Sequence, residues 1–579
     1  MNRAILIALF AFAACGADAN TFYAAPGGGA SASCVDSGAN VCTVNRCLAG
    51  AITANGDTCV LAPGTYPGSE LGASGYIMET SKFVTLECSG AKGSCILQPT
   101  GANVSGIRLN SPVAGGTMTV KKITIDGSLA TPLDQCFYAS DATGIYSLVL
   151  EDTDCREANI YGVRVVANEL NLTMSNNDMS ASSAVTPTHY VGTVGTWVEG
   201  SVVIDGGNVT IAKYNGESPS AVVRITAADA GETASVKNLN IDITNDPAKT
   251  SKNLDVITVT NIPNAVIQGN TITVHGANVG ATGPACDSSV CRQVRVARCY
   301  STGAYSSAGC SITDNVLSVE AANGQMIAIG YDQTSAGDGQ SGSGLIADND
   351  VTCVADATSM HGVGVFWSQG GKVTRNEIRN CGIGMLSKDQ PTAGADFVDN
   401  VVWGAWEEYA YAKGTTAPRF LSNALIIDNA SGTPLVVGVD GGANSTGVVF
   451  KDNLVWSPSG DTPTNLVKTA SSQTIANLGS DGNDWYGFAS YQWTYLGSTY
   501  STIANWNALA VVGTDISAEP QIASSNPSRA MQLIPRDTSP LVRSGVCYLA
   551  TGCVYPDFRG YRARVPPNIG IMQQGAGSP

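Results

Sequence analysis

The chain of 579 residues is poor in charged side chains and contains only three His. Charged residues make up 13% of it, and Asp and Glu exceed Lys and Arg, so that the formal net charge is −16. Nucleic-acid partners favour a basic surface, so this balance argues against one. Zinc sites draw on His and on closely spaced Cys pairs, and the sequence has few of the first and no Cys-x-x-Cys.

Long apolar runs are also missing beyond the amino terminus, which argues against a membrane-spanning helix. The first residues carry Arg3, an apolar run over residues 5–14 and then Ala17-Asp18-Ala19. This order predicts a signal peptide over residues 1–19, cleaved after Ala19. The segment ending at Cys15 also resembles a lipoprotein box, which leaves a lipid anchor as the alternative. Both interpretations place the chain at the cell surface, in the periplasm or outside the cell.

Cysteines are numerous for an exported chain and favour disulfides. Seventeen are present, and sixteen remain once Cys15 is removed or lipidated. An even number of cysteines in an oxidising compartment predicts pairing. The expected bridges are Cys353–Cys381 between neighbouring coils, and Cys88–Cys95 and Cys547–Cys553 as local loops.

A short phrase, an Asn flanked by polar residues and followed by an aliphatic residue, recurs along the middle of the chain. From Asn349 onward the main copies are 23 to 30 residues apart, and steps of 93 and 45 residues before them are close to multiples of the same unit. The copies begin at Asn177, Asn270, Asn315, Asn349, Asn376, Asn400, Asn423, Asn429 (a weaker form) and Asn453. A period of this size is typical of a solenoid.

Each repeat indicates short strands rather than helices, because Val, Ile and Thr dominate and Gly or Asn separates the apolar runs. Stacked Asn side chains can hydrogen-bond to one another in a ladder, which explains one Asn per coil. The 65 Gly and the low charge agree with a long β-solenoid. We therefore predict an all-β, right-handed parallel β-helix.

Both ends of the chain resemble proteins of the pectin-lyase-like superfamily. A helix predicted over residues 44–53 is followed by Gly56-Asp57-Thr58 and by Pro63-Gly64-Thr65-Tyr66. Residues 485–487, 506–509, 515–522, 538–541, 557–560 and 567–570 look like the closing coils of exported bacterial members. The resemblance implies a helix that covers the open end of the solenoid, where strand edges need protection. The implied domains are residues 20–70 (cap and first coil), 71–475 (β-helix) and 476–579 (closing coils and tail).

Aligning the Asn positions stacks the strands of neighbouring coils and predicts one functional face. Residues 362–369 fall over residues 382–389, with residues 328–333 one coil earlier and Tyr411 one coil later. One predicted column holds Tyr331, Trp367 and Ser387, and the next holds Asp332, Ser368 and Lys388. A Gly-rich insertion over residues 334–344 rises from this region, and such loops often wall a binding site. We therefore predict a groove over residues 328–413.

Aromatic rings beside carboxylates and amines suit sugars, whose C–H faces stack on rings while their hydroxyls form hydrogen bonds. Tyr331, Trp367 and Tyr411 are the expected stacking residues. Asp332 and Asp338 are expected to bind hydroxyls or calcium, and are too few for a complete calcium shell. The predicted partner is a polysaccharide, and the oligomeric state stays open.

A lyase that removes a proton beside a uronate carboxylate needs a cation to neutralise that carboxylate and a base close to it. The β-helix lyases that the chain resembles commonly use Lys or Arg, often with calcium. The resemblance therefore implies Lys388, Arg375 and His361 as catalytic candidates and calcium as the candidate cofactor, with unknown ligands.

Two alternatives stay open. A glycoside hydrolase needs two carboxylates, which Asp332 with Asp338 or Asp389 would supply. The signature sets of polygalacturonases, pectate lyases and mannuronan epimerases do not occur in the sequence. A non-catalytic cell-surface glycan-binding or adhesion protein is therefore the second alternative.

A second basic cluster consists of Arg292, Arg295 and Arg298, which lie among Cys286, Cys291, Cys299 and Cys310. In a regular strand, Arg292 and Arg298 would share one side and Arg295 the other. The cysteines predict a disulfide-pinned loop here, and an anionic-glycan site is the alternative.

Overall fold

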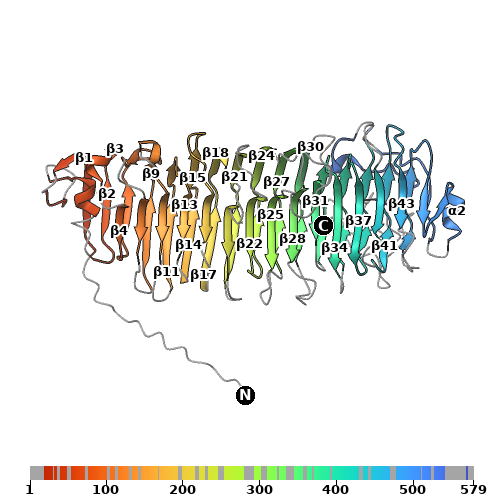
Figure 1. Ribbon diagram of the computed structural model, residues 1–579, viewed down its shortest axis with the longest axis horizontal. Helices are drawn as coiled ribbons and strands as arrows, with labels where there is room; N and C mark the ends of the chain where they lie inside the picture. Colours follow the sequence, from red (N-terminus) through yellow and green to blue (C-terminus); the bar gives the residue numbers. More distant parts are fainter. Residues whose placement is uncertain are drawn as a thin grey trace, which may run out of the picture.

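The computed structural model is one elongated body in which parallel strands stack along its long axis (Figure 1). The structure describes residues 19–29, 32–35, 40–48, 54–71, 76–100, 105–110, 115–129, 133–140, 145–166, 169–193, 199–214, 221–227, 232–245, 253–278, 293–301, 309–322, 325–333, 344–355, 362–367, 371–390, 394–428, 434–440, 445–469, 478–509, 512–522, 524, 527–541 and 569–570. The predicted signal peptide (apart from residue 19), Cys15, Asn429 and the predicted Cys547–Cys553 bridge lie outside these residues.

Three sheets run the length of the solenoid, and each coil contributes one strand to each sheet in turn. Sheet A contains 16 described strands: β1 (Thr21–Gly29), β2 (Thr58–Leu61), β5 (Thr85–Cys88), β8 (Thr117–Lys121), β11 (Tyr146–Glu151), β14 (Glu169–Ser175), β17 (Glu199–Asp205), β20 (Thr233–Lys237), β23 (Val266–Gln268), β26 (Ser311–Thr313), β29 (Leu345–Ala347), β32 (Lys372–Thr374), β35 (Asp396–Val398), β38 (Arg419–Leu421), β41 (Val448–Lys451) and β44 (Leu478–Asp481).

Sheet B follows sheet A in each complete coil. It contains 15 described strands: β3 (Gly64–Pro67), β6 (Cys95–Gln98), β9 (Ile123–Asp126), β12 (Asp154–Arg156), β15 (Asp178–Ala181), β18 (Asn208–Tyr214), β21 (Asn240–Asn245), β24 (Thr271–Asn278), β27 (Val316–Ala322), β30 (Asp350–Ala355), β33 (Glu377–Arg379), β36 (Val401–Trp403), β39 (Ala424–Ile426), β42 (Leu454–Trp456) and β45 (Asp484–Tyr486).

Sheet C completes the coil. It contains 16 described strands: β4 (Tyr76–Thr80), β7 (Ser105–Leu109), β10 (Gln135–Ala139), β13 (Tyr161–Val165), β16 (His189–Thr193), β19 (Ala221–Thr226), β22 (Asn253–Thr260), β25 (Gln293–Ser301), β28 (Gln325–Gln333), β31 (Gly362–Trp367), β34 (Ile383–Gln390), β37 (Glu408–Thr415), β40 (Leu435–Asp440), β43 (Asn465–Thr469), β46 (Trp493–Tyr495) and β47 (Ser498–Tyr500).

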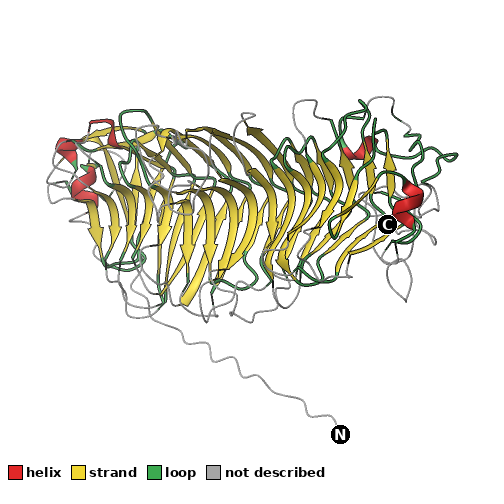
Figure 2. Cartoon of the chain, turned by 45° about the vertical axis from the view of Figure 1, so that its right-hand side comes forward, coloured by secondary structure: helices red, strands yellow, loops and turns green. Residues whose placement is uncertain are grey.

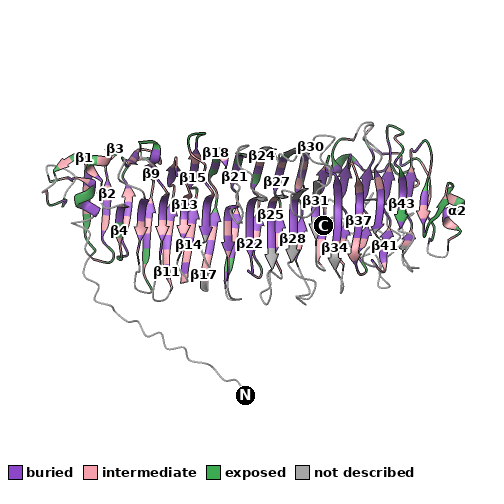
Figure 3. Ribbon diagram, in the orientation of Figure 1, coloured by how far each residue is buried: buried purple, intermediate pink, exposed green. Residues whose placement is uncertain are grey.

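All described pairings between these strands are parallel except that of β46 with β47. Aliphatic side chains of the three sheets point into one continuous core, which the strands surround (Figure 3). The described helices are short (Figure 2). They are α1 (Val44–Arg46), η2 (Gly68–Glu70) and η3 (Gly127–Leu129) toward the amino-terminal end, α2 (Ile503–Asn507) at the carboxyl-terminal end, and η4 (Ala530–Gln532), which packs on sheet B. No helix among the described residues is long and apolar enough to cross a membrane. The predicted parallel β-helix is confirmed.

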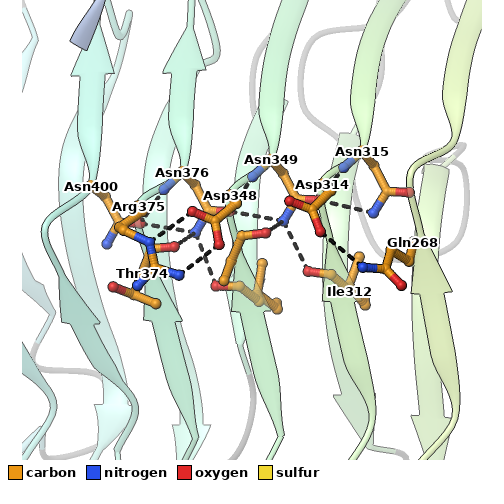
Figure 4. Close-up of polar contacts among 12 residues, drawn as sticks. Gln268, Ile312, Asp314, Asn315, Asp348, Asn349, Thr374, Arg375, Asn376 and Asn400 are labelled. Atoms are coloured by element: carbon orange, nitrogen blue, oxygen red, sulfur yellow. Dashed lines mark hydrogen bonds and ion pairs between the residues drawn. The ribbon is translucent and has the colours of Figure 1, made fainter. Parts of the chain in front are cut away.

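Buried asparagines at the corner between sheets A and B form a continuous hydrogen-bonded ladder (Figure 4). At each step, Oδ1 of one asparagine accepts hydrogen bonds from the backbone N–H and Nδ2 of the asparagine one coil earlier, at 2.8–3.1 Å. The members are Asn270, Asn315, Asn349, Asn376, Asn400, Asn423, Asn453 and Asn483, each 2% exposed or less. The predicted ladder is confirmed and extends one coil further than the sequence analysis placed it.

The irregular spacing earlier in the chain has two different causes. The 93 residues between Asn177 and Asn270 span three coils, in which Gly207 and Leu239 occupy the ladder position. The 45 residues between Asn270 and Asn315 span a single coil, because β24 pairs directly with β27. Reading this second step as a multiple of the repeat was therefore wrong.

A buried carboxylate ends the ladder at its carboxyl-terminal side. Asp515 accepts hydrogen bonds from the backbone N–H and Nδ2 of Asn483, both at 2.9 Å. Its second oxygen accepts from Ser480 at 2.7 Å and from the indole N–H groups of Trp485 and Trp506 at 3.1 and 3.0 Å. An acceptor-only side chain suits this position, because no further coil of the ladder offers an acceptor to an amide.

The amino-terminal end is closed by α1 and two disulfides. The predicted helix over residues 44–53 begins at Val44 as expected, and its α-helical part ends at Arg46. Thr43 caps it by accepting a hydrogen bond from the Arg46 N–H at 3.2 Å. Cys47–Cys59 ties the end of the helix to β2, and Cys34–Cys42 closes the segment before it.

Among the described residues, four further disulfides lie inside the solenoid. Cys88–Cys95 and Cys353–Cys381 are the predicted local and inter-coil bridges, and both are confirmed. Cys136–Cys155 and Cys299–Cys310 were not predicted as pairs. Disulfides of this number are typical of proteins outside the cytosol.

The carboxyl-terminal segment turns back and covers the outer face of sheet B. Ile522, Leu533 and Leu541 pack in one buried cluster with apolar residues of β36, β39 and β42. The backbone N–H of Ala530 donates to Glu377 Oε1 on β33 at 3.0 Å. The segment therefore covers the part of sheet B from β33 to β42.

We expect Asn376→Ala to lower the free energy of unfolding by about 3–5 kcal/mol, because several buried polar groups each lose a hydrogen bond to its side chain at once. These are the Asn349 donors, the Asn400 oxygen and the carbonyl oxygens of Ile346 and Thr374. Urea unfolding of the variant and of the wild type measures the difference. Thr210→Ala, at an exposed position of sheet B, is the control and should change little. Equal losses in the two variants would contradict a structural role for the ladder.

Asp484 lies beside the ladder terminus, and its raised pKa leads us to expect that stability depends on pH. Burial, with the Asp515 charge adding to it, raises the pKa of Asp484 to about 7. The folded state holds this proton more tightly than the unfolded chain, so the contribution of Asp484 to stability is fully present below about pH 4 and is lost as pH rises through 7. The shift corresponds to roughly 4 kcal/mol. Asp484→Asn should remove most of this loss in urea unfolding measured at pH 5 and pH 8. Asp428→Asn, at an exposed position, is the control, and a pH dependence unchanged in Asp484→Asn would refute the assignment.

Candidate functional site

The strands of sheet C share an unusual pattern of burial that sets which side chains face outward. In β25, Val296 and Ala297 are consecutive residues and both are fully buried. The same pair of inward positions is aligned along the sheet, so polar residues lie outside on either side of it. Arg295 and Arg298 therefore lie on the same face. The expectation that they would lie on opposite faces, which assumed strict alternation, was wrong.

One outward column of sheet C is rich in arginine. Register aligns the following residues, from β4 to β25: Glu79, Arg108, Tyr138, Arg164, Gly192, Arg224, Thr258 and Arg298. We call this the central column. Its arginines are placed by short phrases in which buried aliphatic residues flank one polar residue, as in Ile107-Arg108-Leu109 and Val163-Arg164-Val165.

Arg108 is held between two tyrosine rings. Its guanidinium carbon lies 5.0 Å from the ring centroid of Tyr76 and 4.8 Å from that of Tyr138. It also donates to the Tyr76 hydroxyl at 3.0 Å and forms an ion pair with Glu79 at 3.2 Å. These contacts restrict the arginine, and its side chain stays 21% exposed.

Arg164 repeats this arrangement two strands further along. Its guanidinium carbon lies 5.1 Å from the Tyr138 centroid and 5.5 Å from the Tyr161 centroid. Tyr138 therefore contacts an arginine on each side. Nε of Arg108 and Nε of Arg164 are buried nitrogen atoms without a hydrogen-bond partner among the described residues.

Tyr161 continues the stack onto His189. The two rings are stacked with centroids 4.7 Å apart and planes at 8°. His189 Nδ1 lies 2.6 Å from the carbonyl oxygen of Ala221. Burial, with a smaller contribution from the Arg224 charge, lowers the pKa of His189 to about 4. The imidazole is therefore neutral at neutral pH and presents an uncharged ring.

Together these side chains form a continuous aromatic–arginine strip on the outer face of sheet C. It consists of Tyr76, Arg108, Tyr138, Arg164, Tyr161, His189 and Arg224. The strip carries three arginines in a chain whose net charge is −16, with Glu79 as an acidic partner at its end. Such a surface suits a ligand that offers both anionic groups and flat apolar faces.

Acidic side chains also occur along this face. Asp134 immediately precedes β10, where burial raises its pKa and the Arg164 charge opposes the rise. Asp255 on β22 accepts two hydrogen bonds from Arg295 of β25, at 2.6 and 3.0 Å. Arg298 continues the central column and is only 5% exposed. Arg292, Cys286 and Cys291 lie outside the described residues.

The groove predicted over residues 328–413 lies further along the same sheet. Register places Tyr331, Trp367 and Ser387 in one column, as predicted. Ser387 is fully buried, as are Cys299 and Ala412 at the same position of neighbouring strands. The column thus follows the core side of the sheet.

The described residues include only some of the side chains predicted for that groove. Lys388 of β34 is aligned with Lys413 of β37 on the half-buried outer side. Tyr411 is also half-buried there and packs on Ile383 and Leu386. The backbones of Tyr331, Asp332 and Trp367 belong to strands and their side chains are not described. His361, Asp338 and the insertion up to residue 343 lie outside the described residues.

Arg375 is not brought together with Lys388. It lies in the turn between β32 and β33, at the corner of sheets A and B beside the asparagine ladder (Figure 4). Its Nε and Nη2 donate to the two carboxylate oxygens of Asp348 at 2.7 and 2.6 Å. These hydrogen bonds raise the pKa of Arg375. Lys388, in contrast, lies near the carboxyl end of a sheet C strand.

A metal site cannot be built from the described side chains. Within the described ranges, no three His, Cys, Asp or Glu side chains converge to hold an ion. The calcium expected from the resemblance therefore stays a prediction without assigned ligands.

The strip was missed in the sequence because no repeat was aligned before Asn270. A signal is present in the recurring phrases Gly106-Ile107-Arg108-Leu109, Gly162-Val163-Arg164-Val165 and Val222-Val223-Arg224-Ile225. Aligning these phrases would have placed their arginines in one column.

No family model and no curated protein matches the chain. Among solved structures, the crystal structure of pectate lyase Pel9A matches at 13% identity with a TM-score of 0.27, covering 96% of each chain. The A-module of the Azotobacter vinelandii mannuronan C-5 epimerase AlgE6 matches at 13% identity with a TM-score of 0.23, covering 80% of this chain and 91% of that one. At these values neither likeness assigns a function or a site residue.

We expect His189 to stay neutral down to about pH 4, because its ring is buried in the strip. The unfolded chain takes up this proton near the ordinary pKa of about 6.5, so the folded state loses stability as pH falls from there toward 4. NMR of isotope-labelled histidine, with His189→Gln to assign the signal, measures the titration. A His189 signal that titrates near pH 6.5 in the folded protein would contradict the assignment.

Proposed function

We propose that the protein is an exported polysaccharide lyase that binds an acidic polysaccharide along the outer face of sheet C. The observation that carries the proposal is the aromatic–arginine strip. It supplies ring edges at Tyr138 and Tyr161, whose faces are covered by neighbouring side chains, and cations at Arg108 and Arg164, in contact with one another along the solenoid. The pairing of ring and cation matches a sugar with a carboxylate.

The arginines are held in place before any ligand binds, which favours binding. Tyr76, Glu79 and Ser140 fix the Arg108 head, and Gln135 lies 3.5 Å from Arg164 Nη1. Side chains that are already ordered lose less conformational entropy on binding. The mutual spacing of the cations is then set by the sheet.

The proposed reaction is β-elimination at a uronate. A base removes the proton on the carbon that bears the carboxylate, the adjacent glycosidic C–O bond breaks, and a C=C bond forms between the two carbons. The leaving oxygen takes up a proton. A cation against the carboxylate stabilises the charge that develops there. Arg164 and Arg224 are proposed to bind carboxylates of the polysaccharide away from the cleaved bond. Lys388 is the proposed base, and Lys413, aligned with it on the next strand, is the proposed cation at the reacting carboxylate.

Non-catalytic glycan binding is the second candidate. It is favoured by the separation of Lys388 on β34 from Arg164 on β13, with six strands of sheet C between them. A single glycan would need to span these strands to meet both residues. The experiment must therefore measure binding and turnover separately.

The purified protein should be incubated with polygalacturonate, alginate, unsulfated chondroitin and a neutral glucan. Ultraviolet absorbance of unsaturated uronate reports elimination, new reducing ends report any cleavage, and calorimetry reports binding. We expect elimination of at least one acidic polymer. Arg164→Ala should weaken binding about tenfold, from the loss of a charged contact. Lys388→Ala should reduce turnover while binding is kept.

Arg529→Ala is the matched control, since its side chain is 68% exposed on the segment over sheet B. It should leave binding and turnover unchanged. Binding without any cleavage would replace the lyase by the glycan-binding protein. Failure to bind every acidic polymer would refute both candidates.

A further inference from the structure

Arginines occupy every second strand of the central column. Arg108, Arg164 and Arg224 lie on β7, β13 and β19, and a single strand of sheet C separates each from the next. Neighbouring strands are about 4.8 Å apart, so successive arginines are about 10 Å apart along the axis. Arg298 on β25 keeps the same alternation.

The strands between them carry uncharged surface at the same position. Tyr138 on β10 offers a ring that two arginines contact from either side. Gly192 on β16 has no side chain, and a Cβ there would lie 2.8 Å from Tyr161 Cε1 and 3.0 Å from His189 Cγ. The glycine therefore makes room for the stacked Tyr161 and His189 rings, which occupy the space that a side chain would fill, and this position carries no charge.

The acidic residues of this face also follow the alternation. Asp134 adjoins β10, and Asp255 belongs to β22, both between strands with a central arginine. A carboxylate of a ligand lying over β10 would meet the like charge of Asp134, whereas the charge of Asp255 is paired with Arg295. A carboxylate over β7, β13 or β19 would meet an arginine.

Two sugars of an extended polysaccharide span about the distance between alternate strands of a sheet. We infer that the strip selects a polysaccharide in which acidic and uncharged sugars alternate, over one that is acidic at every sugar. The acidic sugars lie on the arginines, and the uncharged sugars lie over the ring edges of Tyr138 and Tyr161, which are half-buried. This inference rests on the proposed function, because it concerns the same face and names its ligand class.

The test compares polymers that differ in the spacing of their carboxylates. Calorimetry at fixed ionic strength would use length-matched oligosaccharides of hyaluronan and unsulfated chondroitin, which carry one carboxylate for every two sugars. Oligogalacturonate, with a carboxylate on every sugar, and a neutral dextran oligosaccharide complete the set. We expect the alternating oligosaccharides to bind about tenfold more tightly than oligogalacturonate, and the preference to shrink as salt screens the charges.

Variants of Tyr138, one of which changes the spacing of the cations along the central column, provide the second part of the test. Tyr138→Arg places a cation on an intermediate strand, and should lower affinity for hyaluronan while raising it for oligogalacturonate. Tyr138→Phe keeps the ring and should keep the wild-type preference. Tyr138→Ala removes the ring without adding charge and should weaken the alternating ligands about tenfold, because the apolar ring edge and the support of Arg108 and Arg164 are both lost. Thermal unfolding of each variant checks that the fold is retained.

The outcomes separate this inference from the proposed function. Equal or tighter binding of oligogalacturonate by the wild type would overturn the alternating ligand, while binding of an acidic polymer to sheet C would still stand. The same holds if Tyr138→Arg keeps its fold and leaves the ratio of the two affinities unchanged. Binding of none of the acidic oligosaccharides would overturn both.

Discussion

The side-chain hydrogen bond from one asparagine to the next is the constraint on which the register of the solenoid depends. Each ladder asparagine is buried and donates a hydrogen bond to a backbone carbonyl of the preceding coil, so a coil cannot slide without breaking several buried hydrogen bonds. A slip of one residue would send every side chain of a strand to the opposite face. The ladder on the corner of sheets A and B thus keeps the columns of sheet C aligned in the coils that contain it.

Where the ladder is interrupted, other buried contacts keep neighbouring coils in register. Gly207 and Leu239 lack a side-chain amide, and Leu239 still donates its backbone N–H to Asn270 at 3.0 Å. Cys136–Cys155 and the hydrogen bond from Thr153 to Asn177 hold earlier coils together. The aromatic–arginine strip lies over these coils, and its own ring contacts add to their alignment.

The sequence was sufficient for the fold and insufficient for the site. Repeated asparagines, β-branched runs and cysteine spacing predicted the parallel β-helix, the ladder and two of its disulfides, since each depends on local pattern. The site depends on which residues stack across coils of unequal length, and long connections hide that alignment. Where two consecutive residues both point inward, as Val296 and Ala297 do, simple alternation assigns the residues that follow to the wrong face of the sheet. Asp515 lies in a phrase that resembles the closing coils of the family, but its role as ladder terminus is visible only once the last coil is in place.

A column that alternates arginine with uncharged residues has a consequence for how such a chain can lengthen. Solenoids grow by duplication of coils, and each coil adds one residue to every column. Duplicating a single coil within β7–β19 would set two arginines, or two uncharged residues, side by side and shift all later ones out of phase. Duplicating two adjacent coils would preserve the alternation. The repeat that must be duplicated to keep the alternation on this face is therefore a pair of coils, although the structural repeat of the fold is a single coil.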